Sequence, residues 1–318
     1  MAVKKDNKKT NNQNFQMIKK PRPVKLKELA LWIEQCDERL EGQLDKIAAE
    51  VCAEDVKVLR LIGPTCAGKT TAATMLKRKF RDYGKHLHLV SIDDFYYNTE
   101  LLRKRSEEQG KESIDYDSPD TIDTEALDRF VTEIFTEDRS HCPIFDFNVG
   151  ERTGYKEFKC GSEDIFLFEG IQVLYPAVSE IFAKTGHETV EIYIAPRSSI
   201  EIGGSVFEPN EIRLMRRIVR DRNFRRTEAD FTLRLWRSVR ENEEKNIFPF
   251  VGDCKYSIDS TMPYEIGILK PYLKRALEAI PENSELSDEK EKMLKKIKGV
   301  LSLPDTLIPE GSIYKEFV

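Results

Sequence analysis

The residues best suited to chemistry lie in one short stretch, LIGPTCAGKTT, which spans residues 61–71. Gly63 to Thr70 fits G-x-x-x-x-G-K-[ST] at every fixed position. Glycines let such a loop curl until several N–H groups point at phosphate oxygens, and a following helix adds its positive dipole end. Lys69 is expected to reach the β- and γ-phosphates, and Thr70 to hold Mg²⁺ through its hydroxyl. The expected contacts with the phosphates are Gly63, Thr65, Cys66, Ala67, Gly68, Lys69, Thr70 and Thr71.

The segments on both sides of this loop fit the same interpretation. Residues 56–62 read as a buried strand and residues 67–80 as a helix. Strand, glycine-rich loop and helix is the context that separates a phosphate-binding loop from a chance match. Cys66, inside the loop, is expected to fill space, which is commoner for a free cysteine than the alternative of a redox switch.

Carboxylates follow two further expected strands. The strand predicted at 86–92 ends in Asp93-Asp94, and the strand predicted at 164–168 ends in Glu169. Asp93 could take the proton of an attacking hydroxyl or bind Mg²⁺ through water, and Glu169 is placed like the metal-side acid of a Walker-B strand. The alternatives are an aspartate that caps a turn and an ordinary charged strand end.

Aromatic residues beside acids form two clusters, at residues 115–120 and at residues 143–147. Aromatic faces beside carboxylates suit a sugar and a base, because a ring can stack while an acid accepts hydrogen bonds from hydroxyls. Core aromatics flanked by surface acids are the alternative, and the pattern alone favours that alternative.

A run of arginines lies in residues 211–226, EIRLMRRIVRDRNFRR. Arg213, Arg216, Arg217 and Arg220 recur at helical spacing and are expected to share one broad face. In a net-acidic chain such a face calls for an anion, so we expect a lid that closes over a triphosphate. A solvated basic face and an RNA-binding helix are the alternatives.

Composition excludes several classes of protein. The chain has 318 residues and a formal net charge of −5, which disfavours nucleic-acid binding driven by bulk charge. No apolar run approaches the ~20 residues of a membrane span, and the polar N-terminal residues lack the apolar centre of a signal peptide. The six cysteines are scattered without a C-x-x-C pair, which favours the reducing cytoplasm over a zinc site or a disulfide framework.

Strands and helices alternate along most of the chain, which predicts an α/β fold with a mainly parallel sheet and helices on both faces. Further elements are expected as helices at 124–135, 176–184, 209–245 and 263–279 and as strands at 189–195 and 255–259. The predicted divisions are a disordered tail at 1–24, a helical extension at 25–52, a main domain at 53–280 with its lid at about 209–245, and a charged appendix at 281–318.

The motifs GPTCAGKTT, SIDDFYYN, DYDSPDTID, PIFDF, FLFEGI and RLMRRIVRD together resemble the uridine kinase and phosphoribulokinase family of P-loop kinases. The later stretches LWRSVRENEEKNIFPF and YEIGILKPYL are similar to a bacterial uridine or nucleoside kinase branch. The resemblance covers about residues 40–318. It implies a P-loop NTPase fold, ATP and Mg²⁺, a small-molecule acceptor with a nucleoside favoured, and a chain that can form homo-oligomers, as family members often do.

The resemblance also implies roles for individual residues. Asp93 matches the general base that acts on a nucleoside 5′-hydroxyl, and Glu169 matches the metal-side acid. Residues that match substrate positions are Tyr96, Tyr116 and Asp117 near the ribose, Phe145 and Phe147 near the base, and Arg217. Arg220 and Arg225 match lid arginines near the triphosphate, and Arg220 joins Lys69 and Asp93 as a catalytic residue.

The sequence departs from the family at two places. Asn148-Val149-Gly150 stands where the animal enzymes have a histidine that contacts the pyrimidine, and Leu235 beside Trp236 stands where they have a lid glutamine. Uridine or cytidine remains the leading acceptor, but a site without those hydrogen bonds discriminates differently. The alternatives are a kinase for a sugar phosphate or vitamin precursor, a nucleotide-dependent switch or ATPase module, and a non-catalytic nucleotide-binding protein.

Overall fold

The computed structural model describes residues 26–54, 56–110, 114, 116 and 118–318. The predicted tail at 1–24 and the candidate substrate residue Asp117 therefore lie outside the described residues.

The centre of the molecule is a five-stranded parallel sheet in the order β2-β5-β1-β6-β9. Its strands are β1 (Val58–Ile62), β2 (His86–Ser91), β5 (Asp164–Glu169), β6 (Thr189–Ala195) and β9 (Tyr256–Asp259). Glu169, the last residue of β5, is in register with Leu61 of β1 and with Ser91 of β2. The loops that follow these three strands consequently leave the sheet side by side, which is where ligands bind in open α/β sheets.

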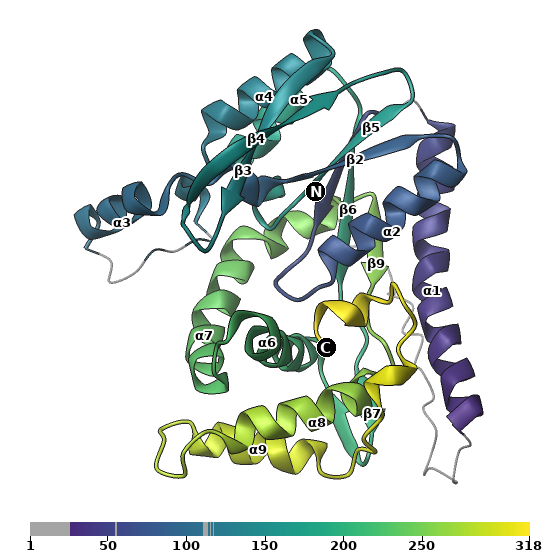
Figure 1. The fold of residues 1–318 in the computed structure, drawn as a ribbon, viewed down its shortest axis with the longest axis vertical. Helices are drawn as coiled ribbons and strands as arrows, with labels where there is room; N and C mark the ends of the chain where they lie inside the picture. Colours follow the sequence, from purple (N-terminus) through teal and green to yellow (C-terminus); the bar gives the residue numbers. More distant parts are fainter. Residues whose placement is uncertain (1–25, 55, 111–113, 115, 117) are drawn as a thin grey trace, which may run out of the picture.

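Helices cover both faces of this sheet, as the alternating pattern predicts (Figure 1). Leu59 and Leu61 enter a core with α1 (Leu26–Ala53) and α2 (Lys69–Asp82). Val58 and Ile62 enter a second core with α4 (Thr124–Thr136) and α5 (Pro176–Ala183). Alternate residues of one strand thus supply two separate hydrophobic cores, because successive side chains of a strand point to opposite faces.

The predicted helical segment at 25–52 forms one continuous helix, α1. Gly42 does not interrupt it, and the helix buries one stripe that includes Leu40, Leu44, Ile47 and Val51. Glycine has a low helix propensity, but this cost is small beside the burial of a whole amphipathic face.

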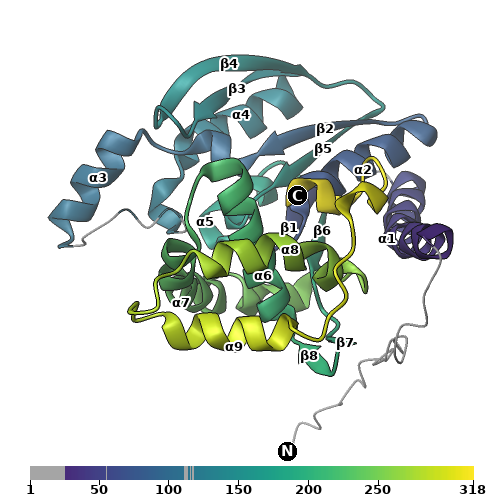
Figure 2. The same cartoon turned by 60° about the horizontal axis from the view of Figure 1, so that its bottom comes forward.

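The predicted helical region at 209–245 consists of α6 (Pro209–Arg225) and α7 (Ala229–Asn246). A capping box between Glu208 and Glu211 starts α6, and Arg226, with φ of 54°, ends it. Next come α8 (Glu265–Glu278) and α9 (Ser287–Ile297), which run alongside each other (Figure 2) and both lie below α6 in the view of Figure 1. Across the described residues, no helix combines the length and the apolar character needed to cross a membrane.

Among the described residues, one α-helix and two hairpins have no counterpart in the sequence-based prediction. They are α3 (Thr99–Glu108), the hairpin of β3 (Arg139–Asp146) with β4 (Glu151–Lys159), and the short hairpin of β7 (Ile200–Ile202) with β8 (Ser205–Phe207). Of α3 only Leu102 is buried, and β4 buries only Phe158. Elements that bury so little carry a weak hydrophobic period.

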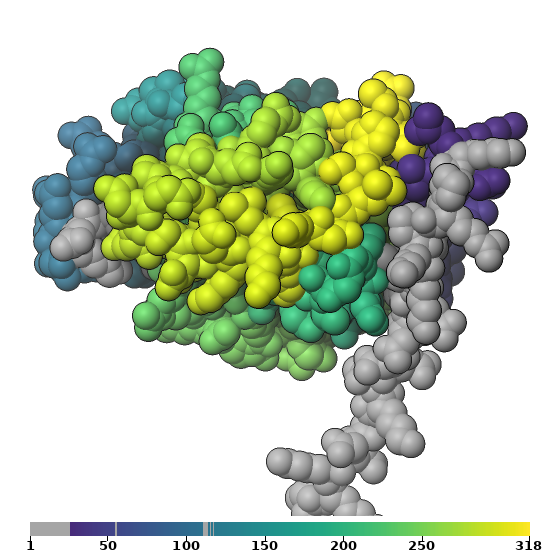
Figure 3. Space-filling view, turned by 90° about the horizontal axis from the view of Figure 1, so that it is seen from below, coloured from purple at the N-terminus to yellow at the C-terminus, as the bar shows by residue number. Residues whose placement is uncertain are grey.

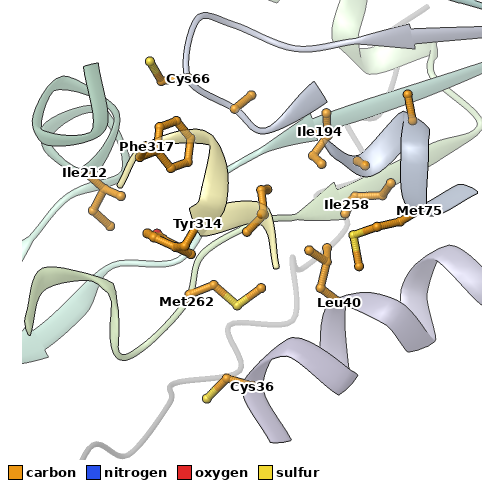
Figure 4. Packing of buried hydrophobic residues seen from close by; sticks show 14 of the residues in the cluster. Cys36, Leu40, Cys66, Met75, Ile194, Ile212, Ile258, Met262, Tyr314 and Phe317 are labelled. Carbon is orange, nitrogen blue, oxygen red and sulfur yellow. The ribbon is translucent and has the colours of Figure 1, made fainter. Parts of the chain in front are cut away.

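The charged segment at 281–318 contains α9 and then a stretch that turns back into the molecule. Ile313, Tyr314 and Phe317, in and next to the 3₁₀ helix η6 (Ile313–Glu316), are fully buried. Figure 3 shows the yellow C-terminal residues lying beside the purple atoms of α1. Figure 4 shows Tyr314 and Phe317 among residues of the main core, near Ile212 and Cys66.

Candidate active site

The predicted phosphate-binding loop connects β1 to α2. Its backbone is left-handed at Cys66 (φ 57°) and at Gly68 (φ 91°). A Cβ atom on Gly63 would overlap the carbonyl oxygen of Ile194 in β6, so the loop can lie this close to the sheet only with glycine there. The helix α2 then begins at Lys69. The loop therefore has the tight curl that its glycines predict.

Two arginines of α6 bind this loop from outside. Arg213 Nη1 donates to the carbonyl of Thr65 at 3.2 Å, and Arg216 Nη1 donates to that of Cys66 at 3.2 Å. Ser260 Oγ donates to the carbonyl of Ala67 at 2.8 Å. The surrounding protein thus holds three consecutive carbonyl groups, which fixes the curl of the loop.

The same two arginines have anionic partners within the protein. Arg213 pairs with Glu243 of α7 at 2.6 Å, and Arg216 pairs with Glu265 of α8 at 2.8 Å. Arg213 is 1% exposed and Arg216 is 0% exposed. The expectation that these two arginines share an anion-seeking surface with Arg217 and Arg220 is therefore wrong. Their charge is neutralised by acids 30 and 49 residues further along the chain, and they anchor the loop.

Lys69 and Thr70 lie at the first turn of α2. Lys69 Nζ donates to the carbonyls of Gly63 (2.8 Å) and Pro64 (3.3 Å), so the lysine folds across its own loop. Thr70 Oγ1 lies 3.5 Å from Glu169 Oε1 at the end of β5. A hydroxyl next to a carboxylate offers the oxygen ligands that Mg²⁺ prefers, so these two residues fit the ion that the fold implies.

The charges around Glu169 show that the predicted site residues converge. Burial raises the pKa of Glu169 to about 7. Lys69 opposes this rise, whereas the carboxylates of Asp93 and Glu316 add to it. Asp93 lies in the 3₁₀ helix η1 (Ile92–Phe95) directly after β2. The residue that follows the end of β2 by two positions is therefore within electrostatic reach of Glu169.

The neighbouring Asp94 has a structural task. Its Oδ1 accepts the backbone N–H of Phe145 at 3.1 Å, and burial raises its pKa. Asp94 thereby ties η1 to β3, and this fixes an aromatic segment beside Asp93. In the sequence, Asp93 and Asp94 are not distinguishable by pattern. In the fold, Asp94 binds the backbone of β3, whereas Asp93 acts on Glu169.

Four aromatic residues from three separate segments meet beyond Asp93. The ring centroid of Tyr96 lies 5.8 Å from Tyr116, 5.7 Å from Phe145 and 5.8 Å from Phe147. Phe145 and Phe147 are 5.0 Å apart. Phe145 is buried, whereas Phe147 is 59% exposed and Tyr116 is 36% exposed. We call these residues the aromatic cluster; its exposed members present apolar faces that a planar ligand could cover.

A buried glutamine supports the aromatic cluster. Tyr96 Oη donates to the carbonyl of Tyr116 at 2.9 Å, and Gln172 Nε2 donates to Tyr96 Oη at 2.5 Å. Gln172, in the 3₁₀ helix η3 (Gln172–Leu174), is completely buried. The sequence prediction missed this residue. Its only local signal is its position three residues after Glu169, in the loop that leaves β5.

The other three candidate arginines of α6 share one acid. Asp221 Oδ1 lies 2.6 Å from Arg220 Nη2 and 3.8 Å from Arg225 Nε, and Asp221 Oδ2 lies 3.3 Å from Arg217 Nε. Asp221 is 5% exposed. One carboxylate among three guanidinium groups leaves a surplus of positive charge and holds the side chains in a fixed arrangement. The sequence prediction missed Asp221, although its position inside the arginine run was visible.

The two departures from the family pattern have clear places in the fold. Asn148 to Gly150 form the turn between β3 and β4, where the N–H of Asn148 donates to Asp146 Oδ1 at 2.8 Å and Gly150 has φ of 78°. Trp236 lies over the guanidinium group of Arg213 at 5.3 Å, and Leu235 is 37% exposed. Trp236 therefore covers a loop anchor.

Comparison with known proteins now supplies the family. Residues 58–262, more than half of the chain, match the Phosphoribulokinase / Uridine kinase family model. A uridine kinase of Clostridium novyi (strain NT) is 24% identical over 254 residues, which cover 77% of this chain and 96% of that protein. A uridine kinase of Latilactobacillus sakei subsp. sakei (strain 23K) is 26% identical over 184 residues, 58% of this chain and 75% of that protein.

The solved structure of phosphoribulokinase from Rhodobacter spheroides aligns with a TM-score of 0.42 and 14% identity, over 77% of this chain and 98% of that one. The predicted resemblance and the predicted α/β P-loop fold are confirmed by the family match and by the sheet itself. The chain is a P-loop kinase that belongs to the phosphoribulokinase / uridine kinase family.

Proposed function

We propose that this kinase transfers the γ-phosphoryl group of ATP to the 5′-hydroxyl of a nucleoside, with uridine or cytidine as the leading acceptor. The main support is the convergence of Lys69, Thr70, Asp93 and Glu169 at the ends of β1, β2 and β5, with the aromatic cluster beside Asp93. The family relatives named uridine kinase support the same acceptor class.

In this mechanism the acceptor oxygen attacks the γ-phosphorus while the bond to the bridging oxygen breaks and ADP leaves. Asp93 takes the proton of the attacking hydroxyl. Lys69 exchanges its contacts with the loop carbonyls for phosphate oxygens, and Arg220 stabilises charge on the transferring group. Thr70 and Glu169 would hold Mg²⁺, which when bound neutralises charge on the β- and γ-phosphates.

The acceptor is assigned to the side of the aromatic cluster. Phe145 and Phe147 are proposed to lie beside the base, with Tyr96, Tyr116 and Asp117 near the ribose and Arg217 nearby. An exposed aromatic face binds any planar base, whereas rejection of one base depends on hydrogen bonds. Because a hairpin turn stands where the animal enzymes read the base, we expect broader acceptance among nucleosides than a histidine contact would allow.

The lid is assigned to the second half of α6 and to α7. Arg213 and Arg216 fasten the first half of α6 to the phosphate loop through buried ion pairs. Arg220 and Arg225 lie beyond those anchors, and the connection at 226–228 ends α6. We therefore propose that the side chains of these distal arginines turn over the triphosphate when it binds, while the helices stay in place, and that they exclude water that would otherwise hydrolyse ATP.

The deciding assay measures ADP formation by purified protein with Mg²⁺ and ATP against nucleosides, sugar phosphates and no acceptor. Turnover with uridine or cytidine supports the proposal. Turnover only with another acceptor keeps the mechanism and replaces the substrate, and hydrolysis without an acceptor contradicts a kinase that excludes water.

Asp93→Asn tests the general base. We expect kcat to fall by ~10²–10⁴-fold, because that is the usual contribution of a positioned base, while the Kd for ATP stays near that of the unaltered protein. Asp288→Asn is the matched control, since Asp288 is exposed in the first turn of α9, outside the elements that carry the site. Full phosphotransfer by Asp93→Asn, together with normal ATP binding, would remove Asp93 from this role.

A further inference from the structure

Residues 312–318, here called the C-terminal segment, lie against the phosphate loop although they fall outside the part of the chain that matches the family model. A Cβ atom on Gly68 would overlap the side chain of Ile313. Ile313 is fully buried, as are Tyr314 and Phe317. The segment is therefore packed directly onto the loop that is expected to hold the phosphates.

Three polar contacts fix the C-terminal segment to two helices, α6 and α1. Arg216 Nε donates to Tyr314 Oη at 3.1 Å, and Asn223 Nδ2 of α6 donates to the carbonyl of Phe317 at 3.1 Å. Ser312 Oγ donates to Asp37 Oδ1 of α1 at 2.7 Å. A segment held by α1 and, at two points, by α6 has a defined position at the site, and Figure 4 shows Tyr314 and Phe317 packed among residues of the main core.

This position brings Glu316 to the first turn of α2. Thr71 Oγ1 donates to Glu316 Oε2 at 3.1 Å, and the glutamate remains partly exposed. Burial lowers the pKa of Arg220, but the Cys66 thiol, Asp221 and Glu316 raise it by more. Glu316 also raises the pKa of Glu169. The carboxylate of Glu316 therefore interacts electrostatically with both Arg220 and Glu169.

A carboxylate is an unusual neighbour for an anion-binding loop, because its negative charge repels phosphate. An ionised carboxylate also cannot donate a hydrogen bond to a phosphate oxygen; it can only accept one from a donor group. Lys69 and Thr70 are assigned to the β- and γ-phosphates and the metal ion, so Thr71, one residue further along, is expected toward the α-phosphate and the nucleoside. The nucleoside is the part of ATP that carries hydroxyl and amino donors.

We propose that the C-terminal segment forms one wall of the phosphate-donor site, and that Glu316 selects the donor by accepting a hydrogen bond from its nucleoside part. This inference rests on the proposed function, because it assumes a nucleoside triphosphate on the phosphate loop. Thr71, together with the buried Tyr314 and Phe317 in and next to the same 3₁₀ helix, holds the carboxylate in place for that contact.

The test compares two ligands that share phosphates and differ in the nucleoside. ATP and inorganic tripolyphosphate are titrated calorimetrically with Mg²⁺, without an acceptor, into the full chain and into Glu316→Gln. We expect Glu316→Gln to weaken ATP binding ~10-fold or more, as for loss of a hydrogen bond to a charged group, and to leave tripolyphosphate binding equal or tighter. Glu310→Gln is the matched control, since Glu310 is an exposed glutamate six residues earlier and should change neither affinity.

Other results overturn the inference. If Glu316→Gln bound both ATP and tripolyphosphate more tightly by the same factor, Glu316 would act only by repelling phosphate. If the variant bound both ligands unchanged, or both more weakly by the same factor, the C-terminal segment would have only a structural role. An unaltered chain that binds neither ligand would overturn the proposed function as well, whereas normal nucleoside phosphorylation with an indifferent Glu316→Gln would overturn the inference alone. With the effect present, 2′-deoxyATP separates its sources: insensitivity to Glu316→Gln assigns the contact to the 2′-hydroxyl, and sensitivity assigns it to the base or the 3′-hydroxyl.

Discussion

Glu169 illustrates how a single residue of the site works against stability. Its carboxyl group is half-buried and within electrostatic reach of Asp93 and Glu316, and its pKa is raised to about 7, chiefly by desolvation. A metal ion at this carboxylate would relieve the repulsion, so the unfavourable charge is consistent with a binding role. Ordinary structural carboxylates are placed where their charge is stabilised, as for Asp259, whose hydrogen bonds with Ser198 and Thr261 outweigh burial and lower its pKa.

We predict that Glu169→Gln stabilises the ligand-free protein at pH 8 but not at pH 4.5. The folded-state pKa of about 7 lies above the ordinary value of 4.5, so the unfolded chain releases this proton first, and stability is lost as the pH rises through that interval. The gain at pH 8 should be on the order of 1–3 kcal/mol. Urea unfolding of both proteins at the two pH values measures it, and an equal difference at both would contradict the assignment.

Asp221 is a second residue whose importance lies in what it positions. It contacts Arg217, Arg220 and Arg225 and accepts from Thr232 Oγ1 at 3.4 Å. We predict that Asp221→Asn lowers kcat/KM for ATP by ~10–100-fold, because the hydrogen bonds that orient the arginines carry charge. The KM for the acceptor should change much less.

The control for Asp221→Asn is Asp230→Asn, which removes an acid that pairs with Arg234 at the surface of α7, 3.5 Å away. Steady-state kinetics with varied ATP and varied acceptor separates the two KM values. A loss of stability together with equal falls in kcat/KM for ATP and for the acceptor would mean that Asp221 only supports the fold.

At the scale of elements, α6 combines two functions along its length. Its first half carries buried arginines that bind loop carbonyls, and its second half carries the arginines gathered by Asp221. Helical spacing alone placed all of them on one face. Burial separates them, because a fully desolvated guanidinium group requires an acid inside the protein.

We predict that Arg216→Ala destabilises the protein by about 3–5 kcal/mol, because it leaves Glu265 buried and unpaired. The double variant Arg216→Met with Glu265→Gln should recover part of this loss, since no uncompensated charge then remains. Chemical denaturation measures both variants. Arg234→Ala, which breaks exposed pairs, is the control and should cost at most about 1 kcal/mol.

At the scale of the whole molecule, α1 and the C-terminal segment belong to the same core as the nucleotide-binding elements. A buried network joins them: Asp37 of α1 accepts from Ser312 and from Tyr264, whose hydroxyl group lies 3.3 Å from Ser312 Oγ. We therefore propose that residues 26–53, 56–280 and 281–318 fold as one cooperative unit, rather than as a domain with two appendages.

Leu40→Ala tests this unit. Leu40 of α1 is fully buried in the main core, so truncation of its side chain should lower the free energy of unfolding by about 2–5 kcal/mol, as for other buried leucines. Leu31→Ala, on the same helix but 55% exposed, should change it by no more than about 0.5 kcal/mol. Unfolding followed by circular dichroism and by tryptophan fluorescence should give one coincident transition; two separated transitions would show that α1 folds independently.

Much of the fold could be predicted because it is encoded locally. The strand at Thr189–Ala195 and the helix beginning at Thr124 were predicted at the positions where they occur, since each has a clear hydrophobic period and a flanking turn signal. α3 and β4 were missed because little of either is buried. The aromatic cluster was visible as two motifs, but its assembly around Tyr96 depends on the hairpin of β3 and β4.

By itself, the sequence determined the phosphate-binding loop, the parallel α/β order of elements, and the carboxylates that end β2 and β5. These follow from residue type and short-range spacing, which govern backbone conformation directly. Only the tertiary structure decided that Arg213 and Arg216 anchor the loop, that Asp221 gathers the other arginines, and that residues 312–318 lie against Gly68 and Thr71. Most of these contacts join groups far apart in the chain, and even the local ones depend on burial, which is set by the packing of the whole molecule.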